Sequence, residues 1–446
     1  MLRLPAYAQF EITDVCNLRC KHCYHFDTEQ MPQSEDLKDD QTIKVVEKLI
    51  EAQIYSLTIT GGEPLCRFDL TSKVVQIAKK AGLFVSVNSN LLLLKNTMID
   101  RFLAYGLDSF LVSCPATDPD VYRLVTRCGN YFYFEDKLNL LIKSGISCLV
   151  NMVVTQNNFH LVRRTAKDLS KMGVKRFSAT PAGLNVEYPD IQNLLTAQQI
   201  NILLEDLRWC SEELGLSVDM LVPLPKCFLP TWCWEGEYAF MRRACQAGRT
   251  SVIVSNIGEV RPCPHNPISY GNILNESFEK IWEKMAIYRD VDNGVVPLIC
   301  RHCPSLPSCN GSCRTNSLAT TGRLDQPERF TVGHIPFKRK SKETVITEDS
   351  IITVSGLLKW RKELNGRYSI CLSHQRSNLM IINEELFRFI CWLENSSKVS
   401  VKDLVNITSK ASSYQSLMEV LKTLTTRRFI VIEDGLKGGG ENVEDI

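Results

Sequence analysis

Short runs rich in β-branched and aromatic residues alternate with longer amphipathic runs from residue 6 to about residue 180. The short runs predict strands at Ala6–Ile12, Ser56–Thr60, Leu83–Asn88, Ser109–Ser113, Cys148–Val154 and Lys175–Ala179. The longer runs predict helices at Asp40–Ala52, Leu70–Ala81, Thr97–Tyr105, Glu135–Ser144 and Leu161–Met172. Alternation of this kind is typical of a parallel sheet with helices outside it. Six such units predict an α/β fold, a partial (β/α)6 barrel of TIM type, with its active site at the carboxyl ends of the strands.

The pattern changes after a further predicted helix at Thr196–Leu214. Residues 215 to 329 are rich in Cys, Pro and turn residues, so we expect bound metal to replace a missing apolar core there. Periodic runs return near residue 350 and predict a small winged-helix-like α+β module. Its strands are expected at Tyr368–Leu372, Leu379–Ile382 and Phe429–Ile432. Its helices are expected from Glu384, from Ser400 and at Ser416–Thr425. The chain is therefore divided into a barrel (1–214), a cysteine-rich domain (215–335), a linker (336–349), a terminal module (350–435) and a Gly-rich, acidic tail that is expected to be disordered (436–446).

Composition narrows the class of protein. The chain has 446 residues and a formal net charge of only +2, which does not favour nucleic acid or a membrane surface as its main partner. No stretch approaches the roughly 20 apolar residues of a membrane-spanning helix, and the start lacks a signal-peptide pattern, so a cytoplasmic protein is expected. Eighteen cysteines are many for a reducing compartment, where clustered cysteines indicate metal sites. Seven scattered cysteines are expected to be small buried hydrophobes: Cys66, Cys114, Cys128, Cys148, Cys210, Cys371 and Cys391.

The loop after the first predicted strand contains three cysteines with the spacing CxxxCxxC, namely Cys16, Cys20 and Cys23, and Tyr24 follows them. A four-iron cluster can take three thiolates from such a loop and leave one iron open to a small molecule. A zinc site is the alternative for closely spaced cysteines. About 40 residues later, Gly61-Gly62-Glu63-Pro64 follows the second predicted strand, so both motifs are expected at the same edge of the sheet.

Together these two motifs resemble the signature of radical S-adenosylmethionine (SAM) enzymes. The resemblance implies that the three cysteines ligate a [4Fe–4S] cluster whose open iron binds the amino and carboxylate groups of SAM. It implies that reductive cleavage gives methionine and a 5′-deoxyadenosyl radical, which takes a hydrogen atom from an unactivated carbon. Tyr24 would pack near the adenine, and the GGEP element would bind SAM: the glycines would let the backbone approach it, and Glu63 would accept hydrogen bonds from its ammonium.

Two weaker correspondences concern the SAM carboxylate. Ser113 ends the fourth predicted strand, where the family places a polar contact, but the usual Ser-x-Asp-Gly reads Ser-Cys-Pro-Ala here. Arg127 lies roughly where the family has a carboxylate-binding arginine; a surface arginine is the alternative.

A second set of cysteines begins at Cys245, which is followed after twelve residues by Gly258 and after four more by Cys263. The set continues with the spacing CxxCxxxxxCxxxC, formed by Cys300, Cys303, Cys309 and Cys313. This pattern resembles the SPASM extension of radical SAM enzymes, which binds auxiliary [4Fe–4S] clusters. The resemblance implies one cluster at Cys245, Cys263 and Cys313, with Cys227 or Cys233 as fourth ligand. It implies a second cluster at Cys300, Cys303 and Cys309. The seventh cysteine of the pattern is absent, so Asp325 or Glu328 would supply oxygen or the iron would stay open; zinc at residues 300–313 is the alternative.

The terminal module resembles PqqD-like peptide-binding domains through five segments: Gly366–Ile370, Met380–Glu384, Phe389–Leu393, Ser400–Leu404 and Arg428–Val431. Most relatives carry this module at the amino end. The resemblance implies that it binds the leader of a ribosomal precursor peptide as an added strand on the hairpin edge.

The expected activity is that of a peptide maturase (a RiPP-modifying enzyme), which crosslinks its substrate through a thioether, carbon–carbon or carbon–oxygen bond. Reduced flavodoxin or ferredoxin would be the electron donor. One alternative is a sulfatase-maturase-like or cofactor-biosynthesis enzyme. Sulfatase-activating enzymes, however, have Asp directly after the cysteine that corresponds to Cys263, whereas this chain has Pro264 there. A scaffold without catalysis, binding peptide or zinc, is the other alternative.

Overall fold

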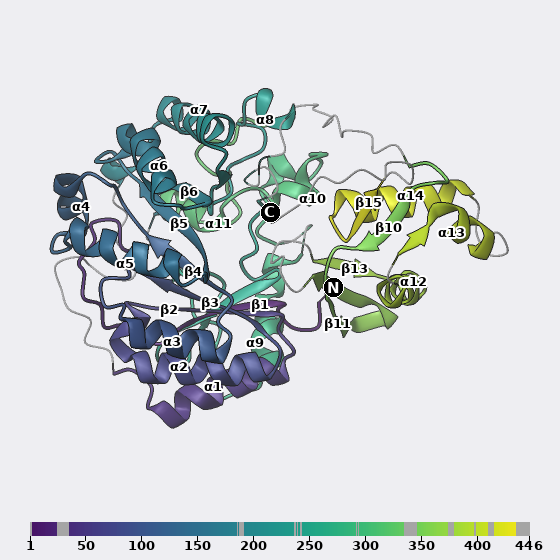
Figure 1. The fold of residues 1–446 in the computed structure, drawn as a ribbon, viewed down its shortest axis with the longest axis horizontal. Helices are drawn as coiled ribbons and strands as arrows, with labels where there is room; N and C mark the ends of the chain where they lie inside the picture. Colours follow the sequence, from purple (N-terminus) through teal and green to yellow (C-terminus); the bar gives the residue numbers. More distant parts are fainter. Residues whose placement is uncertain are drawn as a thin grey trace. The chain divides into compact units, whose positions relative to one another are not determined.

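The computed structural model describes residues 2–24, 35–184, 186, 191–235, 238, 240, 243–290, 292, 294–333, 346–372, 379–396, 398–408 and 414–433 (Figure 1). The chain forms two compact units, Leu4–Lys340 and a second one made of Met1–Arg3 and Ser341–Ile446. Most of the predicted linker, residues 336–345, and the predicted tail at 436–446 lie outside the described residues.

The larger unit is built on a nine-stranded sheet with the order β7-β6-β5-β4-β3-β2-β1-β8-β9. The six predicted strands are present close to their expected bounds: β1 (Tyr7–Glu11), β2 (Ser56–Thr60), β3 (Phe84–Ser89), β4 (Ser109–Ser113), β5 (Ser147–Val154) and β6 (Arg176–Pro181). β7 (Ser217–Asp219) and β8 (Ser251–Val254) add parallel strands at the two sides, and β9 (Val260–Arg261) runs antiparallel to β8. The predicted parallel α/β architecture is therefore confirmed.

Helices follow the strands and lie around the outside of the curved sheet (Figure 1). The predicted helices are α1 (Asp39–Glu51), α2 (Phe68–Lys80), α3 (Asn96–Tyr105), α5 (Tyr131–Lys143), α6 (Val162–Lys171) and α7 (Ala197–Leu214). Helix α4 (Pro119–Thr126) was not predicted, although Asp118 accepts hydrogen bonds from two backbone N–H groups of its first turn and proline opens it. An acidic cap followed by proline is a regular helix-start signal.

The two faces of this sheet differ in polarity. The face toward the helices is apolar and buried, as at Phe10 and Ile59. On the other face, Gln9, Thr58 and Ser86 are aligned by the strand register and form a polar row. Parallel sheets with helices on both faces are apolar on both sides. A polar second face therefore indicates a surface that lines a site.

The cysteine-rich segment also has an apolar core, so the expectation that metal replaces one was wrong. Its helices are α8 (Trp232–Glu235), α9 (Phe278–Lys284), α10 (Leu306–Cys309) and α11 (Arg314–Thr321). Ile281 and Trp282 on α9 are buried, and so is Val254 on β8. The segment lacks long periodic runs because its strands are short and β8 takes β1, about 240 residues earlier, as its partner.

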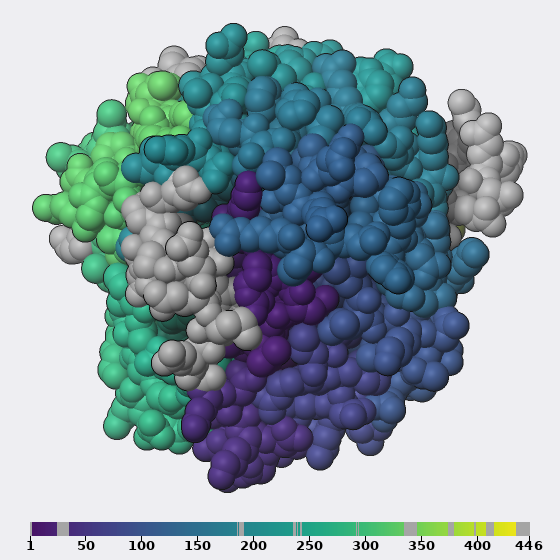
Figure 2. Space-filling model, turned by 90° about the vertical axis from the view of Figure 1, so that its left-hand side faces the viewer, coloured from purple at the N-terminus to yellow at the C-terminus, as the bar shows by residue number. Residues whose placement is uncertain are grey.

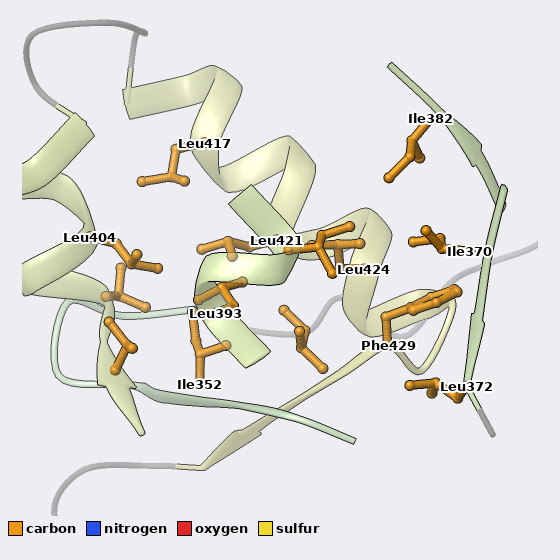
Figure 3. Close-up of a cluster of buried hydrophobic side chains, with 14 residues drawn as sticks. Ile352, Ile370, Leu372, Ile382, Leu393, Leu404, Leu417, Leu421, Leu424 and Phe429 are labelled. Atoms are coloured by element: carbon orange, nitrogen blue, oxygen red, sulfur yellow. The ribbon is translucent and has the colours of Figure 1, made fainter. Parts of the chain in front are cut away.

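The smaller unit contains two three-stranded antiparallel sheets, β14-β10-β15 and β11-β12-β13. Its elements are β10 (Ile351–Val354), β11 (Leu358–Lys362), β12 (Tyr368–Leu372), β13 (Met380–Ile382), α12 (Glu384–Asn395), β14 (Val399–Ser400), α13 (Val401–Thr408), α14 (Tyr414–Thr426) and β15 (Ile430–Glu433). Figure 3 shows its core, in which side chains from both sheets and the helices meet, among them Ile352, Ile370 and Leu421.

In the part of the chain that the structure describes, no helix has the length and apolar character required to cross a membrane.

Candidate active site

Cys16, Cys20 and Cys23 lie in the loop that follows β1, and the backbone turns so that the N–H of Cys23 donates to the carbonyl of Cys20 at 3.1 Å. Burial, with a contribution from the neighbouring Cys23, raises the pKa of the Cys16 thiol to about 12. Burial also raises the pKa of Cys20, as do both other thiols of the loop. Closely spaced thiols whose thiolate forms are disfavoured are a donor set that a bound metal cluster would stabilise.

The end of α4 supports this loop. The N–H of Lys21 donates to the carbonyl of Val125 at 2.9 Å, and that of Arg19 to the carbonyl of Thr126 at 3.3 Å. Arg127, expected at the SAM carboxylate, is the next residue, and its φ of +66° ends the helix. Figure 2 shows the purple N-terminal segment at the surface beside the blue residues of this region. The unpredicted helix α4 is thus what holds the cysteine loop.

The two glycines of the GGEP element bring two loops together. The N–H of Gly62 donates to the carbonyl of Thr13 at 2.7 Å, and that of Glu63 to the carbonyl of Val15 at 2.8 Å. A Cβ at Gly61, where φ is +129°, would lie 2.3 Å from the Thr13 oxygen, and one at Gly62 would lie 2.3 Å from the Val15 oxygen. We expected the glycines to admit a ligand; in the structure they admit the backbone of the cysteine loop.

Glu63 is buried at the start of the short 3-10 helix η1 (Pro64–Arg67). Its Oε1 accepts hydrogen bonds from the Leu65 N–H at 3.0 Å and the Ser89 hydroxyl at 2.8 Å, and its Oε2 accepts one from the Asn90 N–H at 2.8 Å. Burial raises the pKa of this carboxyl to about 7, against the effect of these donors. A carboxylate oxygen accepts about two hydrogen bonds, so Oε2 retains capacity for an ammonium.

A polar bridge that the sequence motifs do not predict joins the cysteine loop and the GGEP loop. The amide Nδ2 of Asn90 donates to Oδ1 of Asn17 at 2.8 Å, while its backbone N–H holds Glu63. Asn17 stands between Cys16 and Leu18, so this pair ties the buried carboxylate to the cysteine loop. The sequence did contain a signal for this bridge, because Ser89 and Asn90 directly follow the predicted third strand, Leu83–Asn88. Polar residues at that position of a parallel sheet reach the catalytic edge.

Tyr24 packs against His265, with ring centroids 4.6 Å apart and planes inclined at 42°. Burial raises the pKa of the Tyr24 phenol and lowers that of the His265 imidazole to about 4. The buried Nδ1 of His265 has no hydrogen-bond partner among the residues that the structure describes. A Cβ on Gly183, just after β6, would lie 3.1 Å from the imidazole Cε1. A neutral imidazole that the sequence analysis did not single out thus lies between β6 and the cysteine loop.

Other candidates lie near the same edge of the sheet. Ser113 ends β4 and is exposed, and its register partner on β5 is Asn151. Cys114 is buried as expected. The same expectation was wrong for Cys128, which is exposed. Its Sγ lies 3.5 Å from the carbonyl of Asn17 in the cysteine loop.

The second set of cysteines divides into two groups. A cavity of about 60 Å³ is lined by four of them: Cys227, Cys300, Cys303 and Cys309. The other group contains Cys245, Cys263 and Cys313. Burial raises the pKa of Cys313, and the two other thiols of this group add to the effect. Cys227 or Cys233 was expected to join Cys245, Cys263 and Cys313, but Cys227 lines the cavity of the other group.

The remaining candidate ligands are also separated by the fold. Asp325 lies in an exposed ion pair with Arg323, 2.7 Å from its guanidinium. Glu328 is only 3% exposed, and its charge contributes to the raised pKa of Cys313. It is not among the main charges that shift the pKa of Cys300. The charges that act on the buried Cys233 are those of Glu205 and Arg208, so Cys233 does not join either group.

Within the described ranges, no three His, Cys, Asp or Glu side chains converge closely enough to bind one metal ion. Thiolates that serve a four-iron cluster bind different corners of a cube and lie farther apart than the four ligands of one zinc ion. Half-buried donor sets made of sulfur alone fit iron–sulfur clusters in their chemistry.

Comparison with known proteins agrees with this site. Residues 10–169 match the Radical SAM superfamily, and residues 245–304 match SPASM, an iron–sulfur cluster-binding domain. The AdoMet-dependent heme synthase of Methanosarcina barkeri is 25% identical over 345 residues, which cover 74% of this chain and 97% of that protein. The mycofactocin maturase MftC of Mycobacterium tuberculosis is 25% identical over 346 residues, which cover 75% of this chain and 84% of that protein. The crystal structure of Streptococcus suis SuiB bound to precursor peptide SuiA shares the fold, with a TM-score of 0.60 and 15% identity over 74% of this chain and 76% of SuiB.

The protein is therefore a radical SAM enzyme. Within that class it carries a SPASM domain, and its cofactors are SAM with a [4Fe–4S] cluster and one or two auxiliary [4Fe–4S] clusters.

Proposed function

We propose that this enzyme matures a ribosomally made precursor peptide by forming an intramolecular crosslink, either a thioether or a carbon–carbon or carbon–oxygen bond. The observation that carries the proposal is the second compact unit, whose sheet β11-β12-β13 ends at a strand that pairs on one side only among the described strands. The maturase MftC and the peptide-bound SuiB support a peptide as the class of substrate.

Cys16, Cys20 and Cys23 would hold the SAM cluster, and SAM bound there supplies a 5′-deoxyadenosyl radical that removes hydrogen from carbon. Glu63 would accept a hydrogen bond from the ammonium of SAM at Oε2, and the backbone N–H of Asn90 holds that carboxylate. The polar face of the sheet would hydrogen-bond the peptide segment and keep it near this edge. A crosslink removes two hydrogen atoms from the peptide: one would go to the radical, and the other would leave as a proton and an electron, which clusters held by the auxiliary cysteines would accept.

The smaller unit recognises the leader of the precursor in this proposal. β13 (Met380–Ile382) pairs with β12 and is the last strand of its sheet. An extended peptide can add to such an edge through backbone hydrogen bonds, with pockets for alternate side chains providing specificity. The order α12-β14-α13-α14-β15 behind this sheet is compatible with a winged-helix-like, PqqD-like module.

The proposed setting is the cytoplasm, with reduced flavodoxin or ferredoxin as electron donor. A cofactor-biosynthesis role is the second candidate, favoured by the heme synthase relative. A sulfatase-maturase role lacks the aspartate after Cys263, and a scaffold without catalysis does not agree with the Radical SAM match.

Mass spectrometry of candidate precursor peptides, incubated anaerobically with enzyme, SAM and reductant, tests the proposal. We expect a product lighter by two hydrogen atoms, and no product from the variant with alanine at Cys16, Cys20 and Cys23, which should keep auxiliary iron. Deletion of residues 350–446 should leave peptide-independent SAM cleavage intact and weaken binding of the fluorescently labelled peptide at least tenfold. Unchanged peptide affinity after this deletion contradicts leader recognition by the smaller unit.

A further inference from the structure

Four cysteines from two distant stretches of the chain meet around one cavity in the cysteine-rich domain. Cys300, Cys303 and Cys309 belong to a single turn-rich segment, whereas Cys227 comes from about 70 residues earlier. The cavity of about 60 Å³ is several times larger than the roughly 10–15 Å³ that one water requires. The rest of its lining is largely apolar and includes Trp234, Ile299 and Leu306.

Cys227 is a member of this group by position. It lines the same cavity as Cys300, Cys303 and Cys309, and the two residues before it, Pro225 and Lys226, line that cavity as well. The fold therefore brings this upstream stretch of the chain against the turn-rich segment that contains the other three cysteines.

A buried cation lies between the two cysteine groups. Arg314 is 2% exposed, and its guanidinium donates to backbone carbonyls that include those of Leu324 at 3.0 Å and Gln326 at 2.9 Å. It also donates to the carbonyl of Gly311, which lines the cavity, and it directly follows Cys313 of the other group in the chain. Carbonyl oxygens satisfy its donors, and a buried charge requires a counter-charge. The charge of the buried Glu328 acts on Arg314, and iron–sulfur clusters with thiolate ligands, which carry net negative charge, would add to this counter-charge.

We propose that Cys227, Cys300, Cys303 and Cys309 ligate one auxiliary [4Fe–4S] cluster, so that each of its irons has a cysteine ligand. The iron without a cysteine then belongs to the other auxiliary cluster, at Cys245, Cys263 and Cys313. A cluster with four thiolates has no position for a substrate group and serves electron transfer. The cluster with three thiolates is the one that an oxygen ligand or a substrate group can approach, and Glu328 lies buried beside it.

The test uses the full chain with Cys16, Cys20 and Cys23 replaced by alanine, which removes the SAM cluster and leaves about eight auxiliary irons. In this background, Cys300→Ala and Cys263→Ala identify which electron paramagnetic resonance signal of the reduced protein belongs to which auxiliary cluster. Cys227→Ala is expected to lose the signal that Cys300→Ala loses, and about four irons with it. Cys233→Ala is the matched control, because Cys233 is buried six residues later and faces neither group; it should keep both signals and all auxiliary iron.

Loss of the Cys263 signal in Cys227→Ala would overturn the assignment, and so would two unchanged signals. Circular dichroism reports whether each variant folds. If Cys227→Ala does not fold, Cys227→Ser preserves the volume and offers oxygen to the iron. The serine variant is then expected to keep about eight irons and to shift the Cys300 signal alone, whereas an unshifted spectrum refutes the proposal. These readouts need no peptide, so they are independent of whether the enzyme is a peptide maturase.

Discussion

The contact between the cysteine loop and the GGEP loop can be tested with a single methyl group at Gly62. A Cβ there would lie 2.3 Å from the carbonyl oxygen of Val15 and 2.6 Å from that of Asp14. Both obstacles are backbone atoms, which cannot rotate away as a flexible side chain would. Gly62→Ala must therefore push the cysteine loop away from β2.

The magnitude follows from what this displacement breaks. Two hydrogen bonds join the loops, from Gly62 N–H to Thr13 at 2.7 Å and from Glu63 N–H to Val15 at 2.8 Å. Each contributes about 1 kcal/mol net, and overpacking costs about 1–3 kcal/mol, so the free energy of unfolding of the larger unit should fall by about 3–5 kcal/mol. Because the displaced segment leads into Cys16, the SAM cluster should assemble poorly, with about four irons lost and auxiliary iron kept.

Gly82→Ala is the matched control. Gly82 has φ +77°, and no atom lies within 4 Å of a Cβ built there, so alanine adds backbone strain without a clash. We expect this control to cost about 1 kcal/mol and to retain all iron. Denaturant unfolding of the apo proteins and iron analysis after anaerobic reconstitution measure both effects. A Gly62→Ala protein with full iron and a free energy of unfolding no lower than that of the Gly82→Ala control would refute the reasoning.

Two further predictions concern buried charges. Burial raises the pKa of Glu63 from 4.5 to about 7, so its ionisation costs stability as pH rises through that interval. In denaturant titrations, apo Glu63→Gln should gain up to about 3 kcal/mol over wild type between about pH 5 and 8; a pH-independent difference contradicts this. Arg261 pairs with Glu11, which is fully buried on β1. Arg261→Met should cost about 3–5 kcal/mol and Glu11→Gln should recover most of it, whereas additive losses in the double-mutant cycle would exclude coupling.

Much of the barrel could be predicted because its determinants are local. The period of apolar residues within β2 (Ser56–Thr60) and α7 (Ala197–Leu214) placed these elements almost to the residue. The spacing of Cys16, Cys20 and Cys23 was equally informative, since eight consecutive residues contain the donor set and a short loop has few ways to arrange it. The short strand β8, which has little local pattern, was missed, and so was α4, although Asp118 and Pro119 carry a helix-start signal.

The sequence by itself determined the class of chemistry, the parallel α/β sheet and the cysteines available to bind clusters. Only the tertiary structure decided which distant groups meet: Cys227 with Cys300, His265 with Tyr24, and the loop of Gly62 with the loop of Val15. These contacts leave no periodic trace in the chain, because each depends on where several packed elements end. Spacing along the sequence names the candidate ligands, but the packing of the whole chain selects among them.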